Sequence, residues 1–181
     1  MSDLKVAVVG VGALGRHHAR ILSEMAGVDL LAVAEKNPKT GLAVAEKCRT
    51  RWVLDYRELF DEADAVVVAV PTTHHLAVAS EFLERSIPVL VEKPLAATLE
   101  QASQLVELAD ENNTLLQVGH IERFNPATRA AWRICGPPRY IRSERLSTYA
   151  FRSTDIGVVH DLMIHDLDLI LDLVNCRVTR V

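Results

Sequence analysis

Short apolar runs alternate with longer amphipathic stretches over the first two thirds of the chain. The apolar runs are rich in β-branched residues and predict strands at Val6–Val9, Leu30–Ala34, Ala65–Val70, Val89–Val91 and Leu115–Val118. The stretches between them have helical periodicity and predict helices at Leu14–Met25, Pro38–Cys48, His75–Arg85 and Leu99–Asn112. Strands that are apolar on both faces are typical of a parallel sheet covered by helices on both sides. Right-handed crossovers then predict an α/β fold with a doubly wound parallel sheet of the Rossmann type.

The pattern changes after residue 119. A helical stretch beginning near Asn125 ends at the breaker Gly136–Pro138, and the alternating residues Tyr140–Leu146 predict a strand. Val158–Val174 is helical again, and Arg177–Val181 has the pattern of another strand at its start. We therefore predict two domains, residues 1–120 and residues 121–181, the second being the beginning of an unfinished α+β domain.

Composition and charge exclude several classes of protein. The 181 residues are 49% hydrophobic, which is typical of a globular core and excludes a disordered chain. The formal net charge is −4, from 20 basic and 24 acidic residues. Nucleic acids and anionic membranes attract clusters of Lys and Arg, so we expect neither as a partner.

Cysteine usage and the apolar stretches bear on location. Cys48, Cys135 and Cys176 lie far apart without a CxxC pair, so we expect reduced thiols in a cytoplasmic protein rather than zinc ligands. No apolar stretch approaches the roughly 20 residues of a membrane-spanning helix, and the N-terminus lacks the basic segment of a signal peptide. We therefore expect neither a membrane segment nor a signal peptide.

The strongest local signal is the sequence GVGALG at residues 10–15, here called the Gly turn, which follows the first strand and opens the first helix. In this position Gly10 permits a tight turn, Gly12 lets the backbone approach a pyrophosphate, and Gly15 lets helix and strand pack closely. The helix N-terminus adds free N–H donors. A glycine-rich loop without a ligand is the alternative, but the strand and helix on either side favour a dinucleotide.

An acidic residue in the expected place strengthens this interpretation. Glu35 follows the second strand, 20 residues after Gly15, where a carboxylate accepts hydrogen bonds from the adenosine ribose hydroxyls. A carboxylate would repel the 2′-phosphate of NADP, so we expect NAD as the cofactor and NADP as the less favoured one. The adjacent Lys36 leaves NADP open, because a cation there would accept the phosphate.

Three further polar segments end predicted strands at the same edge of the sheet, where ligands bind in open α/β folds. They are Pro71–His75, Glu92–Pro94 and Gly119–Pro126. Each also has an ordinary structural explanation, since His75 would serve as a polar helix cap, Lys93 as a solvated loop cation and Arg123 as a surface charge.

The last predicted helix carries a polar stripe. Asp161, His165, Asp168 and Asp172 share one face if the helix is regular. This is the pattern of a solvated helix face, and the same side chains would also suit a divalent metal. Because nothing else in the sequence indicates a metal, we predict none.

Taken together and in this order, these motifs resemble the Gfo/Idh/MocA family, the nicotinamide-dependent glucose-fructose oxidoreductase and inositol dehydrogenase group. They are the Gly turn, Glu35, PTTHH at 71–75, EKP at 92–94, GHIERFNP at 119–126 and DLMIHD at 161–166. The EKP and the DxxxH spacing are the specific elements, whereas many dehydrogenases share the Gly turn. The last two motifs are most similar to the branch that acts on nucleotide sugars, such as the UDP-N-acetylglucosamine 3-dehydrogenases.

The resemblance implies a set of site residues. On the cofactor side they are Gly10, Gly12, Ala13, Leu14 and Gly15 for the pyrophosphate, Glu35 for the ribose, and Pro71, Thr72, His75 and Glu92 for the nicotinamide half. The catalytic residues would be Lys93, Asp161 and His165. Lys93 and His165 would also contact substrate, together with His120 and Arg123. Thr72 stands where the family often has Asn, which leaves its cofactor contact open.

These residue types suit the oxidation of a secondary alcohol. An imidazole has the near-neutral pKa that a base for the hydroxyl proton needs, and a neighbouring carboxylate orients it. A lysine ammonium stabilises the developing alkoxide. We therefore predict an NAD(P)-dependent dehydrogenase that transfers a hydride between nicotinamide and a ring hydroxyl of a sugar, cyclitol or nucleotide sugar.

Members of this family are longer than this chain, and a large open sheet in their second domain forms the substrate wall and the subunit interface. The chain therefore resembles a family member truncated in its C-terminal domain. A truncated NAD-binding module or regulatory subunit with little catalytic activity is the alternative function. A partly built sheet leaves an unpaired edge, so we expect a homo-oligomer.

Overall fold

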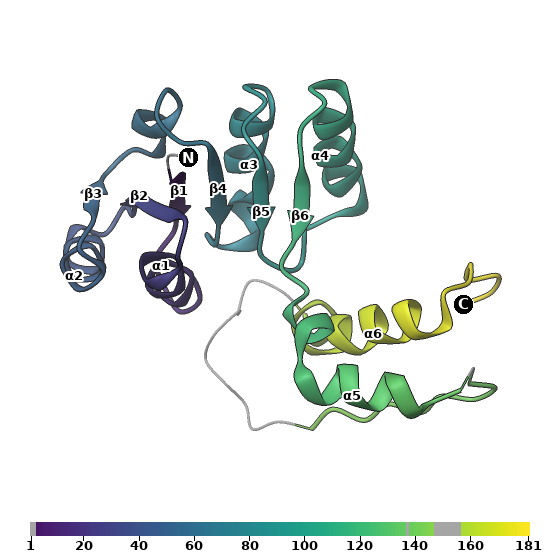
Figure 1. Ribbon diagram of the computed structural model, residues 1–181. Coiled ribbons are helices and arrows are strands. Elements are labelled where there is room, and N and C mark those ends of the chain that lie inside the picture. Colours follow the sequence, from purple (N-terminus) through teal and green to yellow (C-terminus); the bar gives the residue numbers. More distant parts are fainter. Residues whose placement is uncertain (1–2, 137, 147–156) are drawn as a thin grey trace. The chain divides into compact units, whose positions relative to one another are not determined.

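Six parallel strands form one sheet in the order β3-β2-β1-β4-β5-β6 (Figure 1). The computed structural model of the protein describes residues 3–136, 138–146 and 157–181. The strands are β1 (Leu4–Val9), β2 (Val28–Ala34), β3 (Arg51–Val53), β4 (Ala65–Val68), β5 (Val89–Val91) and β6 (Leu116–Val118). Because every pair is parallel, all six strands end at one edge, here called the carboxyl edge. The predicted doubly wound α/β fold is confirmed.

The strand that the sequence did not reveal is β3. It has three residues, begins at the exposed Arg51, and shows no apolar run. Its strand conformation comes from pairing with β2, where Val33 lies opposite Trp52. A strand this short is defined by its neighbour, so no local pattern identifies it.

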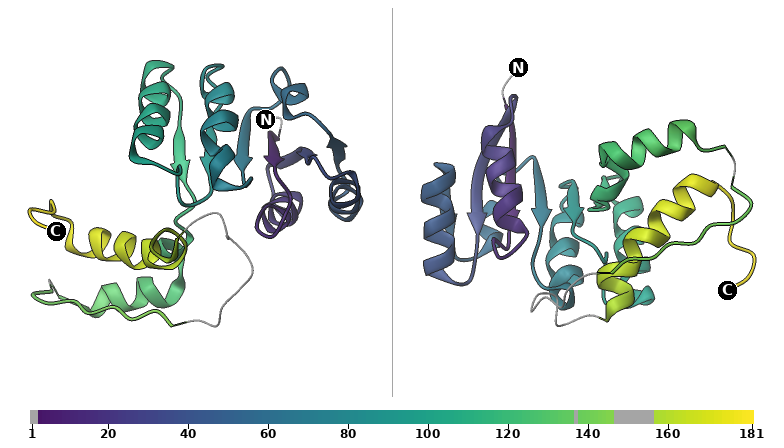
Figure 2. Two further views of the ribbon diagram at one scale, coloured as in Figure 1. Left: turned by 180° about the vertical axis from the view of Figure 1, so that it is seen from behind. Right: turned by 90° about the horizontal axis from the view of Figure 1, so that it is seen from below.

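Helices cover both faces of the sheet (Figures 1 and 2). They are α1 (Gly15–Glu24), α2 (Pro38–Cys48), α3 (His75–Leu83) and α4 (Leu99–Glu111), as predicted to within one or two residues at each end. Buried residues of α1 and α2 cluster with Val6 and Val8, and those of α3 and α4 cluster with Ala7 and Val9. Successive residues of β1 thus enter different cores, which explains why the strand is apolar throughout.

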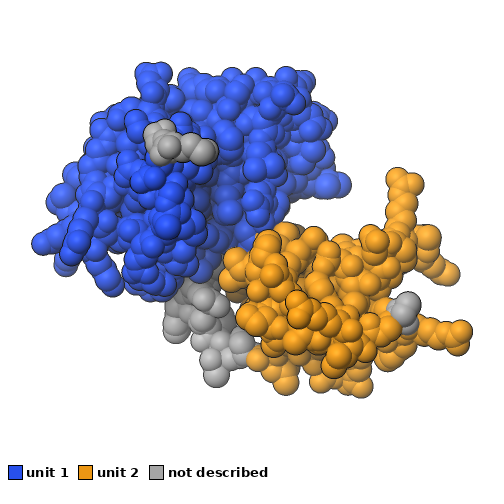
Figure 3. Space-filling model, in the orientation of Figure 1, with its two compact units in different colours: residues 1–119 blue, residues 120–181 orange. Residues whose placement is uncertain are grey.

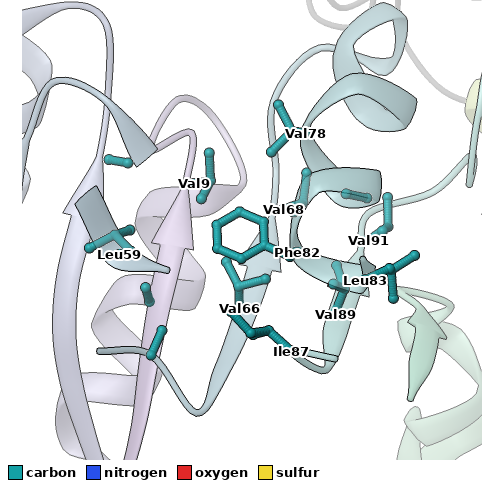
Figure 4. Close-up of a cluster of buried hydrophobic side chains, with 14 of the residues drawn as sticks. Val9, Leu59, Val66, Val68, Val78, Phe82, Leu83, Ile87, Val89 and Val91 are labelled. Atoms are coloured by element: carbon teal, nitrogen blue, oxygen red, sulfur yellow. The ribbon is translucent and has the colours of Figure 1, made fainter. Parts of the chain in front are cut away.

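The larger core centres on α3. Phe82 is fully buried and packs with Val66, Val68 and Leu59, as Figure 4 shows. Leu59 comes from the short 3-10 helix η1 (Tyr56–Leu59), which follows β3. The rings of Phe82 and Phe60 meet edge to face, with centroids 5.0 Å apart. The crossover from β3 to β4 is therefore tied into the same core as α3.

The chain divides into two compact units, Met1–Gly119 and His120–Val181, here called unit 1 and unit 2 (Figure 3). Unit 2 contains the 3-10 helix η3 (Ile121–Phe124), α5 (Pro126–Ile134), the π-turn η4 (Val159–Met163) and α6 (Ile164–Val174). The two helical stretches predicted from the sequence are confirmed. Among the described residues of unit 2, the buried one is Asp168, and no hydrophobic side chain reaches the same burial.

The predicted strand at Tyr140–Leu146 is wrong. These residues have no regular structure, and the side chains of Tyr140 and Leu146 are exposed. A strand requires a hydrogen-bonded neighbour, and none of the described segments pairs with this one. Arg177–Val181 likewise forms no strand. In the parts of the chain that the structure describes, no helix has both the length and the apolar content to cross a membrane.

Candidate cofactor and active site

The Gly turn connects β1 to α1 at the carboxyl edge, and two of its glycines are required by packing. Gly10 has φ +84°, and a Cβ there would lie 2.8 Å from the carbonyl oxygen of Ala69. A Cβ on Gly15 would lie 1.8 Å from the carbonyl oxygen of Gly10. Neither position accepts a larger residue, because the obstacles are backbone atoms.

Gly12 differs from its two neighbours in the turn. A Cβ built on it meets no described protein atom within 4 Å, so the space in front of this residue is open. Ala13 and Leu14 are exposed beside it, and α1 begins at Gly15 with its N–H groups directed to the same place. The turn thus presents an open surface at a helix N-terminus, which fits a pyrophosphate.

Glu35 links the Gly turn to the next loop along the carboxyl edge. Its carboxylate accepts hydrogen bonds from the backbone N–H of Val11 at 3.0 Å and from that of Asn37 at 3.0 Å. A carboxylate has about four acceptor positions, so positions remain for two ribose hydroxyls. Trp52 Nε1 donates to the backbone carbonyl oxygen of Glu35 at 2.9 Å and so holds the main chain of this residue in place.

Glu92 ends β5 and is buried, with 7% of its surface exposed. His18 Nε2 lies 2.6 Å from Glu92 Oε1, and the backbone N–H of Lys93 donates to Glu92 Oε2 at 3.3 Å. Burial by itself would raise the pKa of Glu92, but the His18 hydrogen bond and the charges of His18 and Lys93 lower it below its ordinary value. The carboxylate is therefore an anion that other residues hold in place.

The segment after β4 contains three predicted cofactor residues, Pro71, Thr72 and His75, which differ in their exposure to solvent. Pro71 is exposed, whereas Thr72 in the 3-10 helix η2 (Thr72–His74) is buried. His75 is 1% exposed, with Nδ1 3.0 Å from the carbonyl oxygen of Pro94 and Nε2 2.9 Å from that of Val70. Both nitrogens of His75 thus face backbone carbonyls of neighbouring loops.

The predicted catalytic residues belong to both units. Lys93 is half-buried in unit 1, and Asp161 and His165 are half-buried in unit 2. Their convergence on one substrate stays a prediction. The π-turn contains Asp161, whereas His165 lies in α6. A π-turn has more residues per turn than an α-helix, so Asp161 does not continue the regular stripe of α6 that the sequence suggested.

Arg123, predicted as a substrate residue, binds the carboxylates of α6. Its Nε and Nη2 donate to Asp168 at 2.8 and 2.6 Å, and Nη1 donates to Asp172 at 3.3 Å. The hydrogen bond to Asp168 raises the pKa of Arg123. His120 Nδ1 lies 3.9 Å from Asp168 Oδ2, beyond hydrogen-bonding distance. In this structure Arg123 joins η3 to α6.

A second arginine in unit 2 was not anticipated from the sequence. Arg145 donates to both oxygens of Asp166, at 2.9 and 3.1 Å, and its hydrogen bonds lower the pKa of that carboxyl group. Two carboxylates of α6, Asp166 and Asp168, are thus each held by a bidentate guanidinium. Within the described ranges, no group of three or more His, Cys, Asp or Glu side chains is placed to hold a metal ion.

His18 is the residue of unit 1 that sequence reasoning missed. It lies on the same helix face as Gly15, Ala19 and Leu22, which contact the sheet. A histidine on a core-facing stripe, one turn after a glycine-rich loop, is a signal that the sequence contained. What the sequence lacked was its partner, because Glu92 is 74 residues away.

The sequence of the chain matches those of known proteins. A sequence profile of an oxidoreductase family with an NAD-binding Rossmann fold, Gfo/Idh/MocA, matches residues 4–120. The chain belongs to this family. The UDP-N-acetylglucosamine 3-dehydrogenase of Acidithiobacillus ferrooxidans is 39% identical over 181 residues, which is 98% of this chain and 56% of that protein.

Solved structures extend the comparison to the fold. A crystal structure of that 3-dehydrogenase, GnnA, has a TM-score of 0.91 at 37% identity, with 99% of this chain and 59% of that chain covered. GenD2 from gentamicin A biosynthesis, solved with NAD, has a TM-score of 0.83 at 28% identity, covering 96% and 54%. This Gfo/Idh/MocA chain thus spans a little over half the length of these relatives.

Proposed function

We propose that this Gfo/Idh/MocA chain belongs to an NAD-dependent dehydrogenase that transfers a hydride between NAD and a ring hydroxyl of a sugar, cyclitol or nucleotide sugar. The observation that carries the proposal is one edge of unit 1. There the open surface at Gly12, the Glu35 carboxylate and the Lys93 loop follow β1, β2 and β5, whose ends lie at the same edge of one parallel sheet. Ligands bind at this edge in doubly wound folds, at the point where the strand order reverses.

The residues present fit a dinucleotide at each part that they would hold. Gly12 and the start of α1 would hold the pyrophosphate, and the remaining acceptor positions of Glu35 would hold the ribose hydroxyls. The negative charge of Glu35 favours NAD over NADP. When bound, nicotinamide supplies or accepts the hydride.

The chain's own residues would handle the proton and the charge on the substrate oxygen. His165 takes the hydroxyl proton as the carbon is oxidised, and Asp161 orients and stabilises the resulting imidazolium. Lys93 donates a hydrogen bond to the same oxygen and stabilises the developing alkoxide.

A nucleotide sugar is the substrate class that we favour. Its support is the similarity to the UDP-N-acetylglucosamine 3-dehydrogenase over 98% of this chain. We also propose a homo-oligomer and a cytoplasmic location. The location is supported by the three cysteines, all in the described residues, none of which is in a disulfide.

Two measurements test the proposal. NADH binding, followed by its fluorescence, tests the cofactor site. NAD reduction with sugars, inositols and UDP-sugars tests turnover. Lys93→Met and His165→Ala should abolish turnover and retain NADH binding, and persistence of turnover in both variants contradicts the proposed roles. Binding without turnover in every substrate would instead indicate the NAD-binding module considered as the alternative.

A further inference from the structure

Two histidines contact the residues on either side of Lys93. His18, from α1, lies 2.6 Å from the carboxylate of Glu92, the residue before the lysine. His75, the first residue of α3, lies 3.0 Å from the carbonyl oxygen of Pro94, the residue after it. Glu92–Pro94, here called the EKP loop, is therefore held from both ends by imidazoles that come from separate helices.

The His75 contact is buried, and the His18 contact is partly buried, with 23% of the His18 side chain exposed. Glu92 is 7% exposed and His75 is 1% exposed. Hydrogen bonds in such surroundings are stronger than at the surface, and a buried carboxylate without its partner is costly. Gly119 closes the remaining side of Glu92, since a Cβ there would lie 3.1 Å from the carboxyl carbon. The Glu92 side chain therefore has little freedom to move.

Each histidine also fixes a second point of the carboxyl edge. The other nitrogen of His75 lies 2.9 Å from the carbonyl oxygen of Val70, so the ring lies between the loops after β4 and β5, and in its neutral form it donates to one of the two carbonyls. His18 lies in the first turn of α1, the helix that the Gly turn opens. Through His18 and Glu92, the backbone of Lys93 is thus connected to the helix that follows the Gly turn.

We infer that His18 and His75 are positioning residues for Lys93, forming a clamp that sets where its ammonium meets the substrate. The inference rests on the proposed function for the role of Lys93. Glu92 transmits the contact with His18, because its second oxygen accepts the backbone N–H of Lys93. Neither histidine contacts the reacting atoms in this proposal.

The sequence supplies matched controls, because each of these histidines follows another histidine. His17 precedes His18, His74 precedes His75, and both preceding residues are exposed. A substitution at 17 or 74 therefore changes the same residue type one position away, without touching the EKP loop.

The test places a spectroscopic probe on the lysine itself. Reductive methylation with ¹³C-formaldehyde gives each lysine a dimethylamine NMR signal, and loss of one signal in Lys93→Arg assigns that of Lys93. The internal references are Lys5, Lys36, Lys39 and Lys47. We expect His18→Ala to shift the Lys93 signal and to leave the references unchanged. His18→Gln retains an N–H donor for the carboxylate and should return the signal part of the way.

His75 is tested by His75→Gln, which keeps one donor in the buried site, with circular dichroism to verify folding. We expect it to shift the Lys93 signal, and we expect His17→Ala and His74→Ala to leave it unchanged. If His75→Gln does not fold, the His18 series decides. An unchanged Lys93 signal in folded His18→Ala overturns the clamp, as does an equal shift in His17→Ala.

The same samples separate this inference from the proposed function. The signal of Lys93 is recorded without cofactor, and NADH is then titrated into the wild-type chain. Failure to bind NADH would contradict the proposed function while leaving the evidence on the clamp intact. Binding of NADH to the wild-type chain, together with an unchanged Lys93 signal in folded His18→Ala, would contradict the clamp and leave the proposed function intact.

Discussion

At the scale of single residues, the glycines of the Gly turn have different reasons to be glycine. Gly10 and Gly15 are surrounded by backbone, so they are required by the fold. Gly12 faces open space, so the fold of unit 1 does not explain it. In a turn between a strand and a helix, a glycine in open space is what close approach of a pyrophosphate to the backbone would require, and this is the role that we propose for Gly12.

This difference predicts opposite effects of two alanine substitutions. Gly15→Ala should destabilise the chain by about 3 kcal/mol, because its Cβ would overlap the Gly10 carbonyl and the core must shift. Gly12→Ala should leave stability within about 0.5 kcal/mol, as expected for a surface change, and weaken NADH binding about tenfold, or roughly 1.4 kcal/mol. Urea unfolding and NADH titration measure the two effects.

Gly136→Ala is the control, because a Cβ at that exposed residue also meets no described atom within 4 Å. It should change neither stability nor affinity. Unaltered NADH affinity in Gly12→Ala would argue that the open space at the Gly turn does not receive the pyrophosphate.

Local spacing predicts some single-residue roles better than others. The predicted roles of the Gly turn and Glu35 depend on local spacing, which a sequence displays directly. The substrate role of Arg123 stays a prediction, and in the structure this residue binds Asp168, 45 residues away. The cofactor role of His75 also stays a prediction, and its ring is buried between two carbonyl oxygens. For such side chains the partner decides the role, and long-range partners are not visible in local spacing.

At the scale of elements, η1 and α3 are joined by a polar cluster at the rim of the larger core. Tyr56 donates its hydroxyl to Glu81 at 2.7 Å, and Arg57 donates to both oxygens of Glu81 at 3.0 and 3.1 Å. Burial and the hydrogen bond to Glu81 raise the pKa of Tyr56 to about 12. The cluster fixes the crossover from β3 to β4 against α3.

The titration of Glu81 predicts how this cluster responds to acid. The hydrogen bond from Arg57 lowers the pKa of Glu81 below its ordinary value of 4.5. The cluster therefore stabilises the folded chain above that value, and the contribution is lost as the pH falls through the lowered pKa of the folded state. Glu81→Gln should cost about 0.5–1 kcal/mol at neutral pH, since the pair is largely solvated.

Urea unfolding at pH 7 and pH 3 measures this dependence. The difference between wild type and Glu81→Gln should shrink at pH 3, whereas Glu107→Gln, at an exposed position of α4, should show no difference at either pH. An equal cost of Glu81→Gln at both pH values would mean that packing, and not charge, holds η1 to α3.

The element pair η3 and α6 depends on a buried charge. Asp168 is 8% exposed and accepts two hydrogen bonds from Arg123. Arg123→Gln should destabilise α6 by about 1–2 kcal/mol, less than for a fully buried pair because the guanidinium is partly exposed. Hydrogen exchange of the α6 amides measures this, and Arg133→Gln in α5 should leave those amides unchanged. Equal protection in both variants would show that Arg123 does not hold α6.

The elements themselves were predicted where local signals are strong. The structure shows side-chain caps on two of these helices. Asn37 accepts from the N–H groups of Lys39 and Thr40 at the start of α2, and Thr98 accepts from that of Gln101 at the start of α4. The strand expected at Tyr140–Leu146 failed because alternation reports an amphipathic segment and not a pairing partner.

At the scale of the whole molecule, the two units differ in how they bury apolar surface. Unit 1 has two hydrophobic clusters, one on each face of its sheet. In unit 2, a stripe formed by Met163 at the end of η4 and by Leu167 and Leu171 of α6 is exposed, at 50%, 40% and 46%. Contiguous exposed apolar side chains of this kind mark surfaces that associate.

We therefore expect this chain to self-associate in a concentration-dependent way. Size-exclusion chromatography with light scattering should give a mass above that of the 20.0 kDa monomer. Leu167→Glu combined with Leu171→Glu should shift the chain toward monomer, and Leu42→Glu, on an exposed position of α2, should not. A monomer at every concentration would contradict both the proposed homo-oligomer and the prediction that this apolar stripe mediates association.

The position of β1 in the sheet has a consequence for synthesis. β1 pairs with β2 on one side and with β4 on the other, and the Gly turn rests on Ala69 just beyond β4. A nascent polypeptide that has left the ribosome only through α2 already carries every glycine of the motif and Glu35. It still lacks β4 and Ala69, against which the Gly turn packs, and Glu92, which His18 contacts. We therefore expect the cofactor to bind only after β4 and the EKP loop have been translated.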